Sequence, residues 1–184
     1  LDAAAAWTLL RERAPKRIVE VGSGHSTRVM AAAAPAAELI CVDPAPRAAL
    51  PASARHLAEV LSERHAPLFA ALETGDVAFF DSSHVLHPHT DVDLILTTLL
   101  PALRPGVRVH VHDVFLPDPY PADWTWRGYA EQCGLAPWLL AGAFRPLWSS
   151  RWAVTRMGAG ARPGIAALPL VAGARETSLW MERA

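Results

Sequence analysis

The sequence predicts an α/β fold with a mostly parallel sheet that carries helices on both faces. Short apolar runs alternate with helical segments along most of the chain, which is typical of strands joined by helical crossovers. The first run, Ile18-Val19-Glu20-Val21, breaks into a glycine turn before a helix starts, as in the ligand-binding corner of such sheets. With 184 residues, the chain has room for one sizeable core. We therefore expect residues 1–184 to form a single domain.

The first half of the chain alternates clearly between the two kinds of element. An amphipathic helix ends before Pro15, which cannot continue it. β-Branched and apolar residues then mark buried strands, and prolines mark several helix boundaries. The expected order is a helix at 1–13, a strand at 16–21, a helix at 29–34, a strand at 38–42, a short helix at 46–51, a weaker strand at 56–60, a helix at 67–72 and a strand at 77–80.

The second half begins with the clearest helix and ends less regularly. Apolar residues recur at helical spacing from Asp91 to Leu103, and Pro105-Gly106 follows. A later helix that starts at Trp124 must bend or divide at Gly134 and Pro137. The expected order is a helix at 91–103, a strand at 107–111, a proline-rich loop at 115–123, a helix from 124 to 132 or on to 140, strands at 144–148 and 152–155, and a closing strand at 178–182.

Three kinds of nucleotide-binding turn place glycines after a first strand, and the neighbours of the glycines discriminate among them. A phosphate-binding P-loop needs a Lys-Ser/Thr pair, and none follows Gly24. A dinucleotide fingerprint needs a third glycine where this chain has Thr27. What remains is Glu20-x-Gly22-x-Gly24, followed by Asp43 at the end of the next apolar run. A carboxylate there suits two hydroxyl donors, because it offers only acceptors.

Four ordered motifs carry a resemblance to a known family. They are Glu20-x-Gly22-x-Gly24-His25, Asp81-Ser82-Ser83-His84, His112-Asp113-x-Phe115-x-Pro117 and Trp126-x-x-x-x-Glu131-Gln132. Together they resemble a group of small bacterial class I methyltransferases that depend on S-adenosylmethionine (SAM). The resemblance covers residues 16–132 well and the C-terminal part loosely. It implies a Rossmann-like fold, with a mostly parallel seven-stranded sheet and an antiparallel C-terminal strand.

The same resemblance implies a SAM site around the glycine turn. In this family the turn lies beside the amino-acid half of the cofactor, and the acid that ends the second strand accepts hydrogen bonds from the ribose. A turn with a structural role and no ligand is the alternative. Carried over to this sequence, the cofactor-binding residues are Glu20, Gly22, Ser23, Gly24, His25, Ser26, Asp43 and Asp81.

Acidic and imidazole side chains follow the fourth and fifth expected strands. The carboxyl ends of neighbouring parallel strands meet at one edge of a sheet, and ligands bind there. The candidate catalytic residues are therefore His84, Asp81 and Asp113. His84 is the candidate base for a hydroxyl proton, because imidazole titrates near neutral pH. The alternative is that His84 hydrogen-bonds the facing loop and fixes its shape.

The same two corners also suggest a divalent metal ion. In metal-dependent O-methyltransferases an aspartate and an Asp-Asn pair at these strand ends hold magnesium, so the resemblance makes Asp81, His112 and Asp113 the candidate ligands. A histidine in this set favours manganese, iron or zinc over magnesium. The alternative is that Asp113 accepts backbone hydrogen bonds and His112 shapes the pocket.

Composition favours small-molecule chemistry. The 17 basic and 18 acidic residues leave a net charge of -1, so we expect no electrostatic surface for nucleic acid or a membrane. Cys41 and Cys133 form no disulfide or metal pattern, and the chain starts without a secretory signal, which predicts a cytoplasmic protein. We expect a SAM-dependent methyltransferase that methylates an oxygen of a small molecule. The alternatives are a SAM- or nucleotide-binding module without catalysis and a nicotinamide-dependent enzyme of related fold.

Overall fold

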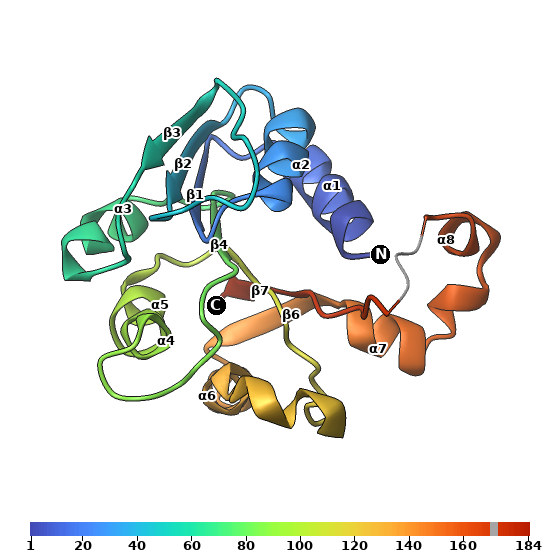
Figure 1. Ribbon diagram of the computed structural model, residues 1–184. Coiled ribbons are helices and arrows are strands. Elements are labelled where there is room, and N and C mark those ends of the chain that lie inside the picture. The colour runs from blue at the N-terminus through green and yellow to red at the C-terminus, as the bar shows by residue number, and fades with distance from the viewer. Residues whose placement is uncertain (170–172) are drawn as a thin grey trace.

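The computed structural model describes residues 1–169 and 173–184. Within them the strands form one seven-stranded sheet in the order β3-β2-β1-β4-β5-β7-β6 (Figure 1). Neighbours among the first five strands are parallel, and β7 is antiparallel to both β5 and β6. The predicted fold is thus confirmed. The strands are β1 (Arg17–Val21), β2 (Glu38–Val42), β3 (Ala54–Leu57), β4 (Val77–Phe80), β5 (Arg108–Val111), β6 (Phe144–Ser149) and β7 (Leu179–Arg183).

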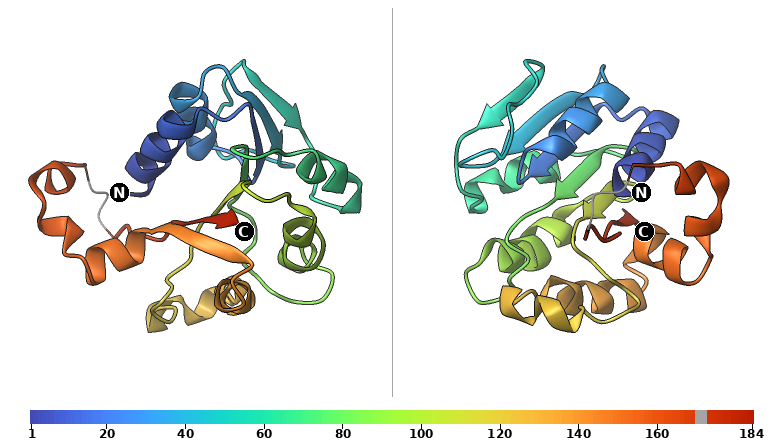
Figure 2. Two further views of the ribbon diagram at one scale, coloured as in Figure 1. Left: turned by 180° about the vertical axis from the view of Figure 1, so that it is seen from behind. Right: turned by 45° about the vertical axis from the view of Figure 1, so that its right-hand side comes forward.

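Helices cover both faces of the sheet, as Figures 1 and 2 show. One face carries α1 (Asp2–Arg13) and α2 (His25–Ala33). The other carries α3 (Ala66–Ala70), the continuous helix made of α4 (Asp91–Leu94), the π-helical turn η2 (Ile95–Leu99) and α5 (Leu100–Ala102), and also α6 (Glu131–Leu140). Two short helices, α7 (Ser150–Thr155) and α8 (Pro163–Ala166), extend to one side near the N-terminus. The remaining elements are the 3-10 turns η1 (Glu63–His65), η3 (Ala122–Arg127) and η4 (Ala159–Ala161).

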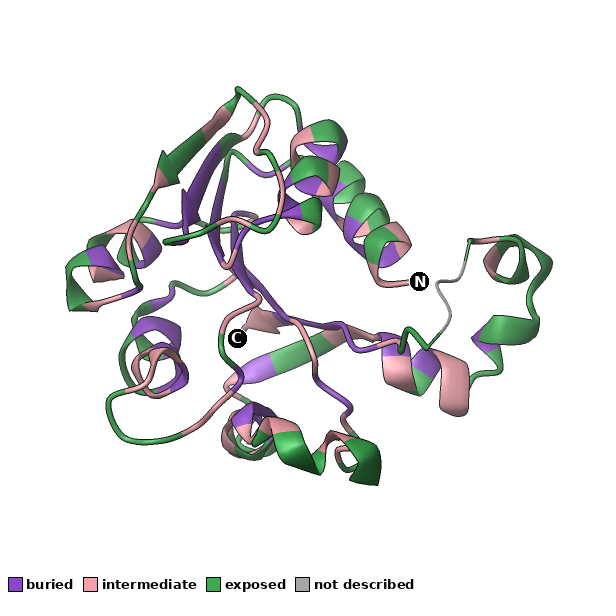
Figure 3. Cartoon of the chain, in the orientation of Figure 1, coloured by how far each residue is buried: buried purple, intermediate pink, exposed green. Residues whose placement is uncertain are grey.

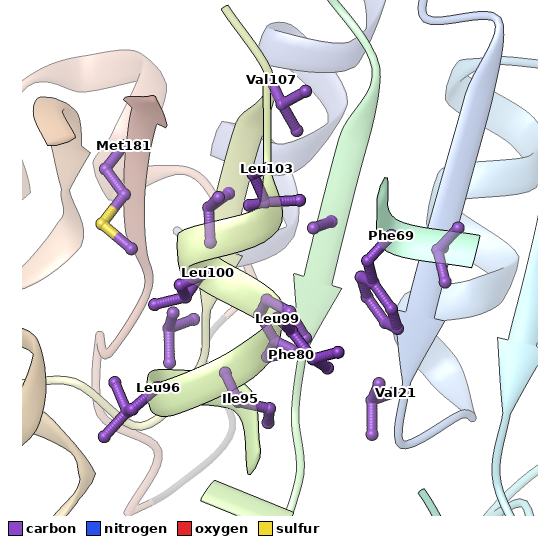
Figure 4. Packing of buried hydrophobic residues seen from close by; sticks show 14 of the residues in the cluster. Val21, Phe69, Phe80, Ile95, Leu96, Leu99, Leu100, Leu103, Val107 and Met181 are labelled. Carbon is purple, nitrogen blue, oxygen red and sulfur yellow. The ribbon is translucent and has the colours of Figure 1, made fainter. Parts of the chain in front are cut away.

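The two layers have separate cores, because consecutive residues of a strand point to opposite faces. Val19 and Val21 of β1 belong to the core beneath α3, α4, α5 and α6, whereas Ile18 belongs to the core beneath α1 and α2. Figure 4 shows part of the first core, where Phe69 and Phe80 stack with ring centroids 5.5 Å apart. The central strands β1, β2, β4 and β5 are therefore almost wholly buried, whereas the edge strands β3 and β6 and the outer helix surfaces are largely exposed or half-buried (Figure 3).

Local signals account for several departures from the expected elements. Residues 46–51 form no helix, and α2 starts at His25, four residues before the expected start. Residues 152–155 lie in helix α7, not in a strand, because the Ser149 hydroxyl accepts a hydrogen bond from the Trp152 amide and caps a helix there. The expected helix from Trp124 divides earlier, at Gly128, whose φ is +67°. Pro101 has no N–H to donate, which fits the π-helical turn just before it.

None of the helices in the described residues is long and apolar enough to span a membrane.

Candidate active site

The glycine turn after β1 is locked against the end of β4. The Asp81 amide donates to the Val21 carbonyl at 2.9 Å. Gly22 has a φ of +79°, and a Cβ at this position would lie 1.9 Å from the Asp81 carbonyl oxygen. Gly24 is different, because its backbone is extended in φ and a Cβ there would meet the Arg47 Cβ at an ordinary 3.4 Å. The steric need for glycine therefore falls on Gly22 and not on Gly24.

Glu20 is enclosed behind this turn. Its carboxylate accepts hydrogen bonds from Ser26 Oγ at 2.7 Å, Thr27 Oγ at 2.6 Å and Cys41 Sγ at 3.3 Å. Burial raises the pKa of Glu20 to about 7. Because Glu20 is fully buried, its placement does not support the expected direct contact with a cofactor. Its carboxylate instead joins β1 to the first turn of α2.

Asp43, at the end of β2, borders a cavity of about 600 Å³. Its two carboxylate oxygens each accept one backbone hydrogen bond, from the amides of Ser23 and Ala45. The cavity is also lined by Leu61 and by the residues after β4. Ser23 Oγ is buried and finds no hydrogen-bond partner among the described residues. Asp43 and Ser23 thus offer polar groups to the same space.

A smaller cavity of about 290 Å³ lies on the α1 and α2 side of the glycine turn. It shares Ser23, Arg47 and Asp81 with the larger cavity, so the two meet at these residues. His25 and Ser26, at the start of α2, also line it. All predicted cofactor residues except Glu20 therefore surround one connected region: Gly22 and Asp43 line the larger cavity, and the others line the smaller or both.

His84 is buried and joins the ends of β4 and β5 through a cluster of acidic side chains. Its Nε2 lies 3.3 Å from Asp81 Oδ1 and 3.7 Å from Asp113 Oδ2, and its Nδ1 lies 2.8 Å from Glu131 Oε2. The imidazole is only 3% exposed, whereas the Asp81 side chain is 24% exposed. Tyr129 packs against the imidazole, with ring centroids 4.8 Å apart. The structure thus brings together the three predicted catalytic residues and adds Glu131.

Electrostatics in this cluster favour a protonated imidazole. Burial alone would lower the pKa of His84, but hydrogen bonds with Asp81 and Glu131 and the negative charges of Glu131 and Asp113 raise this pKa to about 9. Burial likewise opposes ionisation of Asp81, yet the His84 hydrogen bond and the charges of His112 and His84 lower its pKa. The cluster therefore holds an imidazolium beside ionised Asp81 near neutral pH.

The expected metal ligands do not converge. His112 Nε2 lies 3.7 Å from Asp113 Oδ1, and the His84 imidazole stands between Asp81 and Asp113, where a cation would need to lie. Among the described residues, no three His, Cys, Asp or Glu side chains are arranged to hold a metal ion. The prediction of a site at Asp81, His112 and Asp113 is therefore not supported by this arrangement.

Sequence reasoning missed two groups beside the site. Glu131 was visible only as part of a motif, and nothing in its local sequence indicated that it would meet His84. Arg127 lies with its Nη1 3.9 Å from Asp113 Oδ2 and packs over the Trp124 ring at 4.0 Å. Both residues lie beyond the proline-rich loop that follows β5, so only the fold of this loop brings them to the strand ends.

A family model described as a methyltransferase domain matches residues 19–114, so the chain belongs to this family. Together with the observed strand order, this match assigns the chain to the class I SAM-dependent methyltransferases. No curated protein sequence matches the chain.

Solved structures of methyltransferases share the fold. A methyltransferase from Podospora anserina bound to S-adenosylhomocysteine (SAH) is 17% identical, with a TM-score of 0.57 over 99% of this chain and 77% of that one. The O-methyltransferase TomG from Streptomyces achromogenes, in complex with SAM, is 19% identical, with a TM-score of 0.56 over 98% and 78%. An O-methyltransferase from Bacillus cereus in complex with SAH is 12% identical, with a TM-score of 0.57 over 98% and 79%.

Proposed function

We propose that the protein methylates a hydroxyl oxygen of a small molecule, with the Asp81–His84 pair as proton acceptor. The observation that carries this proposal is the imidazole held between two carboxylates at the ends of β4 and β5, next to the cavities at the glycine turn. A hydroxyl oxygen needs a group that removes its proton as it is methylated. Two of the similar solved structures are named O-methyltransferases, which also favours oxygen.

The residues around the glycine turn fit SAM. Each carboxylate oxygen of Asp43 has used one acceptor position on a backbone amide, so capacity remains for the ribose hydroxyls. Ser23 Oγ has no partner among the described residues, and Ser23 lines both cavities. We assign the nucleoside to the cavity of Asp43, and the amino-acid end to the rim formed by residues 23–26. When bound, SAM supplies an electrophilic methyl group on a positively charged sulfur.

Asp81 and His84 have different roles in removing the proton of the acceptor hydroxyl. Asp81 is the more exposed of the two and lines both cavities, so its carboxylate accepts the hydrogen bond of the acceptor hydroxyl. Glu131 fixes His84 through Nδ1, which leaves Nε2 as the nitrogen that takes the proton beside Asp81. Because the pKa of His84 is raised to about 9, the neutral imidazole is a minor form at neutral pH. The rate of methyl transfer should therefore rise with pH up to about 9.

The test combines cofactor binding with methyl transfer. SAH at about 100 times its dissociation constant should stabilise the protein by roughly 2.7 kcal/mol, whereas NAD should leave its melting temperature unchanged. SAM labelled on the methyl carbon, incubated with a library of small phenols and alcohols, should give a labelled O-methyl product. His84→Gln should slow transfer by roughly 100-fold or more.

The matched control is His89→Gln, which changes an exposed histidine five residues away. Transfer at the wild-type rate in His84→Gln would remove His84 from the mechanism. Label found only on nitrogen or sulfur would reject the oxygen acceptor. Failure of SAH to bind the wild-type protein would reject the assignment of the cofactor site.

A further inference from the structure

The smaller cavity extends from the rim at residues 23–26 to a floor that the proposed reaction leaves without a function. This floor is made by Phe79 of β4, His110 of β5 and Ser178 just before β7, and it is faced by small residues of α1 and by Met30 of α2. None of these floor residues was singled out in the sequence motifs. Phe79 and His110 are paired across the neighbouring strands β4 and β5, which makes this part of the floor rigid.

His110 is the unusual member of this floor. It is 1% exposed, and its ring stacks on Phe79 with centroids 3.8 Å apart and planes 13° apart. Its Nε2 lies 3.0 Å from Ser178 Oγ, whereas Nδ1 has no hydrogen-bond partner among the described residues. Leaving a buried polar atom unpaired is unfavourable. A ligand atom that pairs with Nδ1 would remove this penalty.

The apolar part of the lining favours an apolar body for such a ligand, although Asp2 and His112 also line the cavity. Ala3, Ala6, Val29 and Met30 present apolar side chains to the cavity. The volume of about 290 Å³ exceeds the roughly 150 Å³ of an apolar protein cavity that binds benzene. One substituted ring therefore fits. The charged amino-acid end of SAM is better matched by the rim, where Arg47 and the start of α2 supply polar groups.

We propose that the floor binds the ring of the methyl acceptor, a single-ring phenol or hydroxylated heteroaromatic compound whose second polar substituent hydrogen-bonds His110 Nδ1. This inference rests on the proposed function, because it assigns the acceptor to a cavity that Asp81 also lines. With the second substituent at His110, the reacting hydroxyl faces the Asp81 end of the same cavity. His110 then determines specificity by favouring rings that carry the second substituent.

The experiment measures ring binding separately from cofactor binding. Phenol, catechol and resorcinol are titrated into SAH-saturated protein and followed by saturation-transfer NMR. At least one of the two diols should bind about three- to tenfold more tightly than phenol. This preference should disappear in His110→Phe, which keeps a ring against Phe79, and persist in His110→Asn, whose amide keeps a polar atom near the position of Nδ1.

Controls separate the alternatives. Calorimetry should give SAH affinities within about twofold of wild type in both variants and in His65→Phe, which alters another buried histidine outside both cavities. His110→Leu replaces His110→Phe if circular dichroism shows that the latter does not fold. A folded variant with at least tenfold weaker SAH binding would overturn the inference, because the floor would then hold the cofactor.

Two further outcomes would also overturn the inference: a diol preference that survives in His110→Phe, and the absence of ring binding to wild-type protein. Failure of the proposed function gives different results: either the wild-type protein does not bind SAH, or label from SAM appears only on nitrogen or sulfur. The same ring titrations on SAH-free protein would still report on His110.

Discussion

The two sides of the candidate active site are built in different ways. On the β1 and β2 side, the turn and its supports are close in sequence: Glu20 binds Thr27, seven residues later, and Asp43 binds the Ser23 amide, 20 residues earlier. On the β4 and β5 side, His84 meets Glu131, 47 residues away. The first side depends mainly on backbone shape, whereas the second depends on the balance of buried charges. Substitutions on the two sides should therefore have different effects.

The largest effect should come from the backbone of the first side. Gly22→Ala places a Cβ against the Asp81 carbonyl oxygen at a φ of +79°, and strain and overlap together should cost roughly 3–5 kcal/mol of unfolding free energy. Gly75→Ala is the matched control, because Gly75 has a φ of +92° and a Cβ added there would meet no atom of the described residues within 4 Å. It should lose about 1–2 kcal/mol.

Urea unfolding measures both changes. Equal losses in Gly22→Ala and Gly75→Ala would show that the contact with Asp81 does not constrain the turn, and the contrast between the two sides would lose its basis.

A second, pH-dependent effect on stability should come from His84 and the acidic side chains around it. The folded-state pKa of His84 is raised from 6.5 to about 9, so its contribution to stability is fully present below pH 6.5 and is lost as the pH rises through about 9. Since one pKa unit corresponds to about 1.36 kcal/mol, this contribution is roughly 3 kcal/mol. His84→Gln should therefore be less stable than wild type by about this amount near pH 6, and the difference should vanish near pH 10.

Urea unfolding across this pH range, with His89→Gln as the exposed control, provides the measurement. A stability difference that does not change with pH would mean that His84 acts by packing alone. The two sides would then differ in sequence separation but not in physical character.

The smallest of the three effects should appear in cofactor affinity. Asp43→Ala removes the proposed ribose acceptor, and a hydrogen bond to a charged group contributes roughly 1.5–3 kcal/mol, so SAH should bind on the order of 10- to 100-fold more weakly. Asp123→Ala, an exposed aspartate in η3, is the control for loss of a surface carboxylate. Calorimetry that finds SAH affinity unchanged in Asp43→Ala would reject the assignment of the nucleoside to this cavity.

Sequence reasoning succeeded where the decisive interactions are local. Strands β2 and β4 match the expected ranges residue for residue, because their β-branched and aromatic runs are buried on both faces. It failed at residues 152–155, where strand-like composition was overridden by the Ser149 cap and the packing of α7. It also failed at residues 46–51, where prolines suggested a helix that the chain does not form.

The sequence by itself indicated the class of protein, since the four ordered motifs that carry the family resemblance are each made of residues close together in the chain. Only the tertiary structure decided that Glu20 is enclosed, that Glu131 holds His84, and that an imidazole stands between Asp81 and Asp113. The physical reason is that burial and charge pairing depend on which distant segments meet. The spacing of residues along the chain does not indicate that the loop after β5 returns Glu131 to the end of β4.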